Sequence, residues 1–283
     1  MLGAGAGAWA VERGNVPGRT VLHRVLGACA VDSAIPVVPT GPLRAGQFRS
    51  RFRRRRVEWL VAMPPGPPVD GQPVALVLHG RGGTARTAFA EIGLHKFLAQ
   101  YVRRGGKPFA IASIDGGSAY WHPRDGGDNP LGMLIHELLP RLKLLGLRTD
   151  GFGVHGWSMG GYGSLLLARQ SAAGHLAGSR VVAAAAASPA LFPSYSHARE
   201  GSFDDARDFA RWGDLIRDPG VSPDTALRVA CGQTDPFTSA ALSYRAALHP
   251  MPAGGITRGC HDHGYWRSQA AQEIAFLGEH LSA

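Results

Sequence analysis

The chain has 283 residues, of which 45% are hydrophobic, and its formal net charge is +9. This length and apolar content are enough for one large α/β domain with an ample core, and the lack of internal repeats and long hydrophobic segments excludes a repeat array or a membrane-spanning bundle. Lysine occurs only as Lys96, Lys107 and Lys143, so arginine carries most of the positive charge. With abundant Ala, Gly and Pro, this bias is typical of a GC-rich genome rather than of phosphate binding, and no nucleic-acid partner is predicted.

The first 45 residues are predicted to be a leader, followed by one folded domain over residues 46–283. Residues 1–10 have the small apolar character of the end of a signal peptide, with no basic residues before them. The leader is therefore interpreted as the remnant of an export signal. The predicted location is outside the cytoplasm or at the cell envelope, and the cytoplasm is the alternative.

An arginine-rich stretch opens the folded domain. Residues 48–63 alternate arginine with apolar side chains, which is typical of an antiparallel edge hairpin. Arginines on an edge strand protect it from pairing with another chain. Peripheral attraction to an anionic envelope or an acidic glycan stays open as the alternative, and no oligomeric state is predicted.

Apolar strands alternate with helical segments over the rest of the domain. This alternation is typical of a mostly parallel central sheet with helices on both faces. The predicted strands cover residues 74–79, 108–114, 151–155, 181–188 and 229–232, and the predicted helices cover residues 129–145, 161–169, 237–248 and 269–281.

The loop after the first of these strands reads H-G-R-G-G over residues 79–83. It is similar to the H-G-G-G type of loop from which α/β-hydrolases take one main-chain donor of the oxyanion hole, and this places that donor at Arg81. Because only the main-chain N–H is needed, a side chain at this position does not weaken the assignment. His79 is expected to brace the loop rather than to act as a base.

A G-x-S-x-G motif at residues 156–160 lies between the strand at 151–155 and the helix at 161–169. Strand, turn and helix are the context of a nucleophile elbow, in which the serine has positive φ and its hydroxyl stands above the sheet. The small residues Gly156 and Gly160 let the strand and helix backbones approach each other. Ser158 is thus the predicted nucleophile, and the N–H of Met159 is the second oxyanion donor.

Residues 188–218 follow the next strand and are the predicted insertion that shapes the substrate pocket, with a helix over 203–216. Phe192 in this insertion, together with Trp121, Trp157 and Phe237, is predicted to form an aromatic wall beside the serine. Each of these side chains also suits an ordinary core position.

The acid and the base of a serine hydrolase follow the nucleophile in the order Ser, acid, His. Asp235 comes just after the strand at 229–232, where a triad acid belongs, although an aspartate before proline also caps helices. His261 and His263 lie in a Gly-flanked loop before the last helix and are the two candidates for the base, and the resemblance described below favours His261. His263, two residues further on, stays open as the alternative base.

Three cysteines leave an odd thiol even if one pair forms. Cys231 ends the strand before Asp235, and Cys260 directly precedes His261. We expect a Cys231–Cys260 bridge between the two loops as one hypothesis, and free buried thiols as the other.

These segments together resemble the esterase family of α/β-hydrolases that includes S-formylglutathione hydrolase (esterase D), feruloyl and acetyl-xylan esterases, and the mycolyltransferases. The motif-bearing stretches are residues 78–83, 156–163, 232–237 and 259–266, and residues 115–124 are similar to actinobacterial members. The resemblance covers residues 45–283. It implies the α/β-hydrolase fold and a Ser158, Asp235 and His261 triad, without a metal or redox cofactor.

The predicted function is that of a serine-dependent carboxylic ester hydrolase that works through an acyl-enzyme on Ser158. Its substrate is expected to be a small-molecule ester or an ester of a glycan or lipid. An acyltransferase that moves the acyl group to a sugar hydroxyl, like the mycolyltransferases, is one alternative. A catalytically silent binding protein of the same fold is the other.

Overall fold

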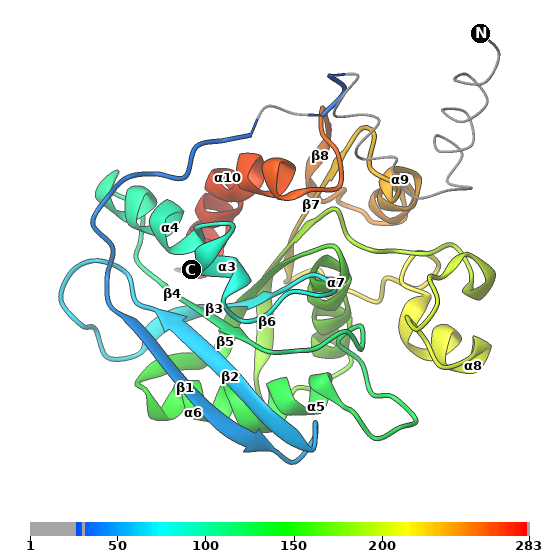
Figure 1. The fold of residues 1–283 in the computed structure, drawn as a ribbon, viewed down its shortest axis with the longest axis horizontal. Coiled ribbons are helices and arrows are strands. Elements are labelled where there is room, and N and C mark those ends of the chain that lie inside the picture. The colour runs from blue at the N-terminus through cyan, green and yellow to red at the C-terminus, as the bar shows by residue number, and fades with distance from the viewer. Residues whose placement is uncertain (1–26, 30–31, 282–283) are drawn as a thin grey trace, which may run out of the picture.

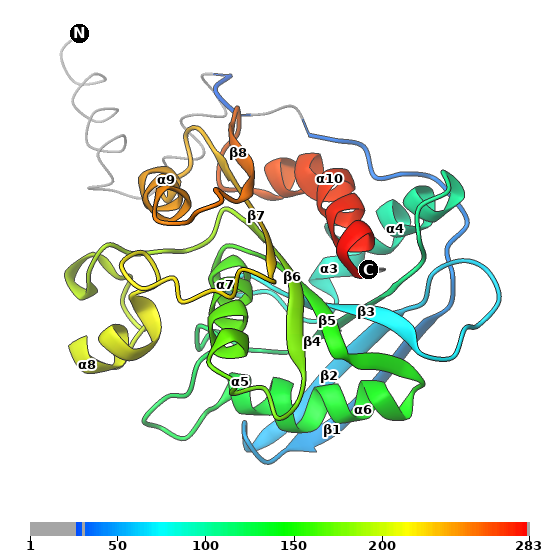
Figure 2. The same ribbon diagram turned by 180° about the vertical axis from the view of Figure 1, so that it is seen from behind.

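The computed structural model describes residues 27–29 and 32–281, so the predicted export-signal remnant at residues 1–10 lies outside the described part. Within that part, an eight-stranded sheet crosses the molecule, and helices cover both faces (Figure 1 and Figure 2). The strands are β1 (Leu43–Ser50), β2 (Arg55–Ala62), β3 (Gln72–Leu78), β4 (Ala110–Ile114), β5 (Leu147–Trp157), β6 (Arg180–Ala187), β7 (Ala226–Gly232) and β8 (Ala253–Thr257).

Their order across the sheet is β1-β2-β4-β3-β5-β6-β7-β8. The strand β2 pairs antiparallel with both β1 and β4, and all other neighbours are parallel. This confirms the predicted α/β-hydrolase fold: a mostly parallel sheet, helices on both faces and an antiparallel N-terminal edge hairpin. The boundary predicted between residues 45 and 46 falls inside β1, which starts at Leu43.

The longer helices divide between the two faces of the sheet. Their bounds, with the short helices that join them, are α3 (Thr87–Ala90), α4 (Leu94–Arg103), α5 (Pro130–Met133), α6 (Leu139–Leu144), α7 (Met159–Ala172), α8 (Ala206–Asp208), α9 (Thr238–Ala246) and α10 (His263–Leu281). Val74, Leu76 and Leu78 of β3 pack into the core beneath α6, α7 and α9. Ala75 and Val77 pack into the other core, beneath α4 and α10. Because side chains alternate along a strand, a continuous apolar run fills both cores.

Two predicted helices are interrupted in the structure. The helix expected over residues 129–145 is α5, then one π-helical turn (Leu134–Leu138), then α6. It begins where predicted, because the Oδ1 of Asn129 accepts a hydrogen bond from the N–H of Gly132 at 2.7 Å. The helix expected over 203–216 is shorter than predicted, with α8 followed by a π-helical turn (Phe209–Gly213).

The arginine-rich turn between β1 and β2 is partly structural. Arg53 is 3% exposed, and its guanidinium donates to both carboxylate oxygens of Asp128 and to the main-chain oxygen of Asp115. Arg55 also lies 3.7 Å from Asp128, and Arg51 lies 3.9 Å from Glu137. These ion pairs explain part of the positive run without a polyanionic partner.

The described part of the leader runs along the outside of α4 and α10 (Figure 1). Residues 32–42 have no regular secondary structure. Asp32 pairs with Arg267 of α10, and Ile35 fills the space beside Gly93 before α4. No helix among the described residues has the length and apolar character to cross a membrane.

Candidate active site

Ser158 occupies a strained turn between β5 and α7. Its φ is 55° and its ψ is −123°, a conformation that L-residues adopt only when their surroundings impose it. The Ser158 N–H donates to Ala187 O at 3.0 Å, and its carbonyl accepts from the N–H groups of Tyr162 and Ala190 at the same distance. The elbow geometry predicted from the motif is therefore present.

The glycines of the motif are required by close contacts. A Cβ on Gly156 would lie 2.2 Å from the carbonyl oxygen of Gly160, and a Cβ on Gly160 would lie 1.8 Å from that of Leu78. Both distances are far below contact distance, so neither position accepts a side chain without moving the backbone.

The side chains of Ser158, His261 and Asp235 form one hydrogen-bonded line. The Nε2 of His261 is 2.9 Å from the Oγ of Ser158, and its Nδ1 is 2.8 Å from the Oδ2 of Asp235. An ionised carboxylate only accepts hydrogen bonds, so Nδ1 carries the proton and Nε2 accepts from the serine hydroxyl. The three residues come from separate segments of the chain, and the fold brings them together in the predicted order.

Asp235 does more than begin a helix. The residue is 2% exposed, and its second oxygen accepts a hydrogen bond from the N–H of Phe237 at 2.8 Å. The helix α9 starts at Thr238 with no side-chain cap. The carboxylate is thus held by one main-chain bond in the orientation that faces His261.

His263 does not take the place of His261. It is the first residue of α10, its side chain is 41% exposed, and its Nδ1 lies 3.2 Å from the Oε2 of Glu91. Its nitrogen therefore contacts a surface carboxylate, and His261 contacts the serine.

The acid loop and the histidine loop are joined by a threonine that the sequence analysis missed. The Oγ1 of Thr234 donates to the carbonyl of Gly259 at 2.8 Å, and its N–H donates to the same oxygen at 3.1 Å. Thr234 precedes Asp235, and Gly259 lies two residues before His261. These bonds fix the spacing of acid and base, and nothing in the local sequence indicates that the two loops are neighbours.

The hypothesis of a Cys231–Cys260 bridge is wrong, and the alternative of free buried thiols holds only for Cys231. Cys260 is bonded to Cys29, with 4.9 Å between their Cα atoms, and Cys231 is free and buried. The reason is that the leader passes beside the histidine loop and brings Cys29 within bonding distance. The Cys231 side chain faces Thr238, and burial raises the pKa of its thiol well above the ordinary value.

His79 braces the loop over residues 79–83. It is fully buried, its Nδ1–H donates to Gly80 O at 2.8 Å, and its Nε2 accepts from the N–H of Gly116 at 2.9 Å. Burial lowers the pKa of His79, so the ring stays neutral and keeps both bonds.

Arg81 occupies the second position of a tight turn, because the N–H of Gly83 donates to Gly80 O at 3.0 Å. Gly82, the third residue, has a φ of 79°, which fits a type II turn. The same loop approaches Ser158 closely, since a Cβ on Gly80 would lie 3.4 Å from that of Ser158. Met159 is the first residue of α7, where helix geometry leaves the main-chain N–H without an intrahelical acceptor.

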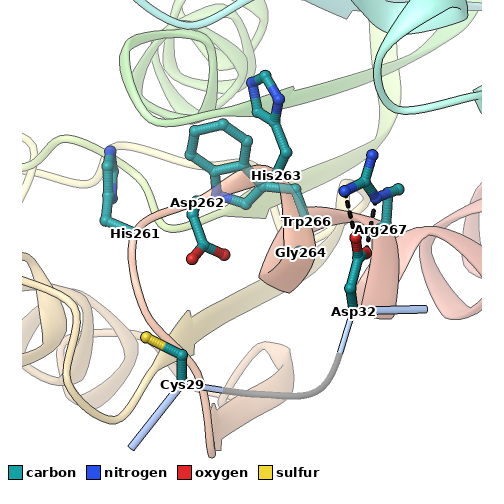
Figure 3. A pocket seen from close by; sticks show the side chains of 8 residues that line it. All are labelled: Cys29, Asp32, His261, Asp262, His263, Gly264, Trp266 and Arg267. Carbon is teal, nitrogen blue, oxygen red and sulfur yellow. Dashed lines mark hydrogen bonds and ion pairs between the residues drawn. The ribbon is translucent and has the colours of Figure 1, made fainter. Parts of the chain in front are cut away.

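One cavity opens directly at the histidine loop (Figure 3). It has a volume of about 640 Å³ and is bordered on one side by the leader and on the other by the start of α10. Its lining residues are Cys29, Asp32, His261, Asp262, His263, Gly264, Trp266 and Arg267. Polar side chains dominate, and Figure 3 shows the Asp32–Arg267 ion pair at the side away from His261.

A second cavity, of about 390 Å³, lies between residues 191–216 and the start of α9. Phe192 and Phe237, two of the four predicted wall residues, line it, and the Phe237 ring is 5.3 Å from that of His261. Trp121 and Trp157 do not form an open wall, because each is only 1% exposed. Both lie in the core, where Trp121 donates to His79 O and Trp157 packs on Trp266.

Polar contacts anchor the predicted insertion at residues 188–218 to the rest of the domain. The Nε2–H of His122 donates to Ser202 O at 3.0 Å, and Arg124 forms an ion pair with Asp204 at 2.6 Å. The insertion therefore has a fixed position beside the site. Among the described residues no group of His, Cys, Asp or Glu side chains is arranged to hold a metal ion.

No protein-family model and no curated protein sequence matches the chain. Solved structures match over most of its length. One is a ferulic acid esterase with 17% identity and a TM-score of 0.71, and the match covers 85% of this chain and 99% of that one. Another is an S-formylglutathione hydrolase from Agrobacterium tumefaciens with 15% identity and a TM-score of 0.69, and the match covers 89% of this chain and 98% of that one. A ferulic acid esterase from Anaeromyces mucronatus, solved with ferulic acid, is similar at 16% identity (TM-score 0.66, 89% and 94%). At these identities the likeness establishes the fold, and this chain has the α/β-hydrolase fold.

Proposed function

We propose that the protein is a serine-dependent carboxylic ester hydrolase. The observation that carries this proposal is the line from Ser158 through His261 to Asp235, with distances of 2.9 and 2.8 Å, on a strained strand-to-helix turn. Strain at a single serine is costly and persists only where the surroundings impose it, and such positions concentrate at active sites. The structural neighbours named as esterases and hydrolases support the same class.

The reaction begins when the Oγ of Ser158 attacks the ester carbonyl and His261 accepts its proton at Nε2. Asp235 holds the ring in the tautomer that can accept this proton and stabilises the imidazolium that forms. The N–H groups of Arg81 and Met159 donate to the developing oxyanion. Collapse of the tetrahedral intermediate expels the alcohol, which takes the proton from His261.

The resulting acyl-enzyme is released by water in a second, equivalent sequence. His261 takes a proton from water, the hydroxide attacks the acyl carbon, and Ser158 leaves with the proton from His261. Transfer to a sugar hydroxyl differs only in the acceptor, so acyltransfer stays the alternative within the same mechanism. Product analysis with and without a sugar acceptor separates the two.

The Cys29–Cys260 disulfide bears on where the protein acts. Disulfides persist in oxidising compartments and are rare in the cytoplasm. We therefore favour export or envelope association over the cytoplasm. Cell fractionation with an antibody to the protein tests this location.

The test of the enzymatic proposal is hydrolysis of p-nitrophenyl esters from acetate to palmitate by the wild type and by Ser158→Ala. We expect Ser158→Ala to lose about a thousand-fold or more in kcat. The matched control is Ser118→Ala, an exposed serine outside the site, which is expected to keep the wild-type rate. A fluorophosphonate probe should add its mass to the wild type and not to Ser158→Ala. Labelling without ester turnover would favour a dedicated transferase, and an absence of labelling would favour a silent binding protein.

A further inference from the structure

The cavity of about 390 Å³ beside Phe237 combines apolar walls with a cationic side chain. Leu191, Phe192 and Ile216 line it from one side, and Phe237 lines it from the other. The Phe237 ring centre also lies 5.3 Å from that of His261, so one aromatic side chain contacts both the cavity and the triad histidine. The apolar walls suit a short alkyl chain or an aromatic ring.

Arg199 is the charged residue of this lining. Its Cζ lies 5.9 Å from the centre of the Phe237 ring, which directs the guanidinium over the aromatic face of the cavity wall. No carboxylate of residues 27–29 and 32–281 forms an ion pair with Arg199. Asp235, which directly precedes the lining residue Pro236, is already bonded to His261 and to the N–H of Phe237.

A second guanidinium lies at the same short loop. The Nη1 of Arg81 donates to Glu200 O at 3.2 Å, and its Nη2 lies close to Gly201. Residues 199–201 therefore join the mouth of the cavity to the loop that carries the proposed oxyanion donor. Arg81 therefore contacts the two residues that directly follow Arg199 in the chain.

We propose that this cavity binds an anionic group of the ester substrate, and that Arg199 selects for it. The ligand is a carboxylate at the end of a short alkyl chain or aromatic ring, on either the acyl or the alcohol side of the ester. The inference rests on the proposed ester hydrolysis and adds the charge of the substrate to it. Arg199 is exposed, so water partly screens its attraction for a carboxylate, and the apolar wall beside it binds the chain or ring that carries the carboxylate.

Matched ester pairs test the acyl side and the alcohol side separately. Mono-p-nitrophenyl succinate and p-nitrophenyl butyrate have acyl chains of equal length and differ in the terminal carboxylate. Para-acetoxybenzoate and para-tolyl acetate differ in the same way on the alcohol. For each pair, kcat/KM for the anionic ester is divided by kcat/KM for the neutral ester, first in the wild type and then in Arg199→Gln. Comparing the two proteins by this ratio cancels the intrinsic reactivity of the esters.

We expect Arg199→Gln to lose about two- to five-fold in kcat/KM on the anionic member of at least one pair, with little change on the neutral member, since Arg199 is exposed and its contact with a carboxylate is partly screened by water. The matched control is Arg207→Gln, an exposed arginine of α8 with the same change in net charge, which should leave both ratios unchanged. An equal loss on charged and neutral esters, or the same loss in both variants, would overturn the proposal.

A binding measurement keeps this inference separate from the catalytic proposal. In the Ser158→Ala background, calorimetry compares phenylpropionate with phenylpropanol, which share a ring and chain and differ in charge. We expect phenylpropionate to bind more tightly, and the added Arg199→Gln change to remove the difference. Equal affinities with and without Arg199 would refute the anion site even if every ester were hydrolysed. Conversely, an inactive enzyme that kept the difference would refute only the proposed reaction.

Discussion

Cys29 is bonded to Cys260, the residue directly before His261, across a sequence separation of 231 residues. Asp32 adds an ion pair with Arg267, and Gly27 O accepts a hydrogen bond from Arg258, so the leader is attached on both sides of the histidine loop. The loop that carries the proposed base is therefore held from outside by a segment that precedes the whole sheet. This attachment restricts where the His261 ring can lie.

Removing the bridge should affect both stability and rate. We expect Cys29→Ser to lower the free energy of unfolding by about 2–4 kcal/mol, because the closed loop no longer restricts the unfolded chain. Ester hydrolysis should fall by up to about ten-fold as His261 loses its fixed position. Thermal unfolding and p-nitrophenyl ester rates measure the two effects.

Reductant provides the control for the bridge. Reduced wild type should have the same stability and hydrolysis rate as Cys29→Ser. Neither quantity should change when reductant is added to Cys29→Ser. In a non-reducing digest, the Cys29 and Cys260 peptides should be linked, and Cys231 should be alkylated only after unfolding. A Cys231–Cys260 peptide would contradict the structure.

Replacing each of the two neighbouring histidines should have very different effects on kcat. We expect His261→Ala to lose about a thousand-fold or more in kcat, since the serine then has no base. His263→Ala should keep the wild-type rate, because its ring pairs with Glu91 on the surface. Steady-state rates on one p-nitrophenyl ester decide between them, and a dead His263→Ala with an active His261→Ala would move the base by two residues.

Gly160 should not tolerate a methyl group. A Cβ there would lie 1.8 Å from Leu78 O, so Gly160→Ala must displace either β3 or α7. We expect the free energy of unfolding to fall by about 3 kcal/mol or more, measured by urea denaturation. Gly126→Ala, where a Cβ meets nothing within 4 Å, is the matched control and should stay within about 0.5 kcal/mol of the wild type. Equal stability of both variants would mean that the elbow is less tightly packed than described.

A buried carboxylic acid should make stability depend on pH. Glu273 of α10 is 1% exposed and faces His155 of β5, with 3.5 Å between Oε2 and Nε2. Burial raises the pKa of Glu273 from 4.5 to about 8, and nearby Arg228 opposes this only in part. Burial likewise lowers the pKa of His155 to about 4, so both side chains are neutral at pH values between these limits.

The sign of the pH effect follows from where the proton is held. The folded protein keeps the Glu273 proton up to a pH of about 8, and the unfolded chain releases it near 4.5, so the free energy of unfolding falls as pH rises through this window. Glu273→Gln is neutral at every pH. We expect its free energy of unfolding to equal that of the wild type near pH 5 and to exceed it by about 2 kcal/mol or more near pH 8.5.

Urea denaturation of the wild type and Glu273→Gln between about pH 5 and pH 8.5 measures the difference in their free energies of unfolding. Because both proteins contain His155, its titration cancels in this difference. Glu279→Gln changes an exposed carboxylate on the same helix and should show no such trend. A constant difference between Glu273→Gln and wild type across the window would mean that Glu273 is ionised in the folded protein.

The local backbone conformation around the site residues was predictable, because each motif is short and depends on residues that are neighbours in the chain. Gly156 and Gly160 around Ser158 indicate a tight elbow, and the structure has one at φ 55°. The apolar runs at 74–79 and 229–232 indicate buried strands, which β3 and β7 confirm. The interrupted helices were not predictable, since π-helical turns leave the apolar pattern of a helix almost unchanged.

The sequence by itself determined the α/β-hydrolase fold and the residues Ser158, Asp235 and His261 as candidates, because hydrophobic periodicity and glycine spacing act over a few residues. Only the tertiary structure decided which histidine meets the serine, that Cys29 and not Cys231 bonds Cys260, and that Trp121 and Trp157 are core. Each of these depends on how segments far apart in the chain approach one another in space. That approach is set by the packing of both faces of the sheet as a whole, and no local pattern encodes it.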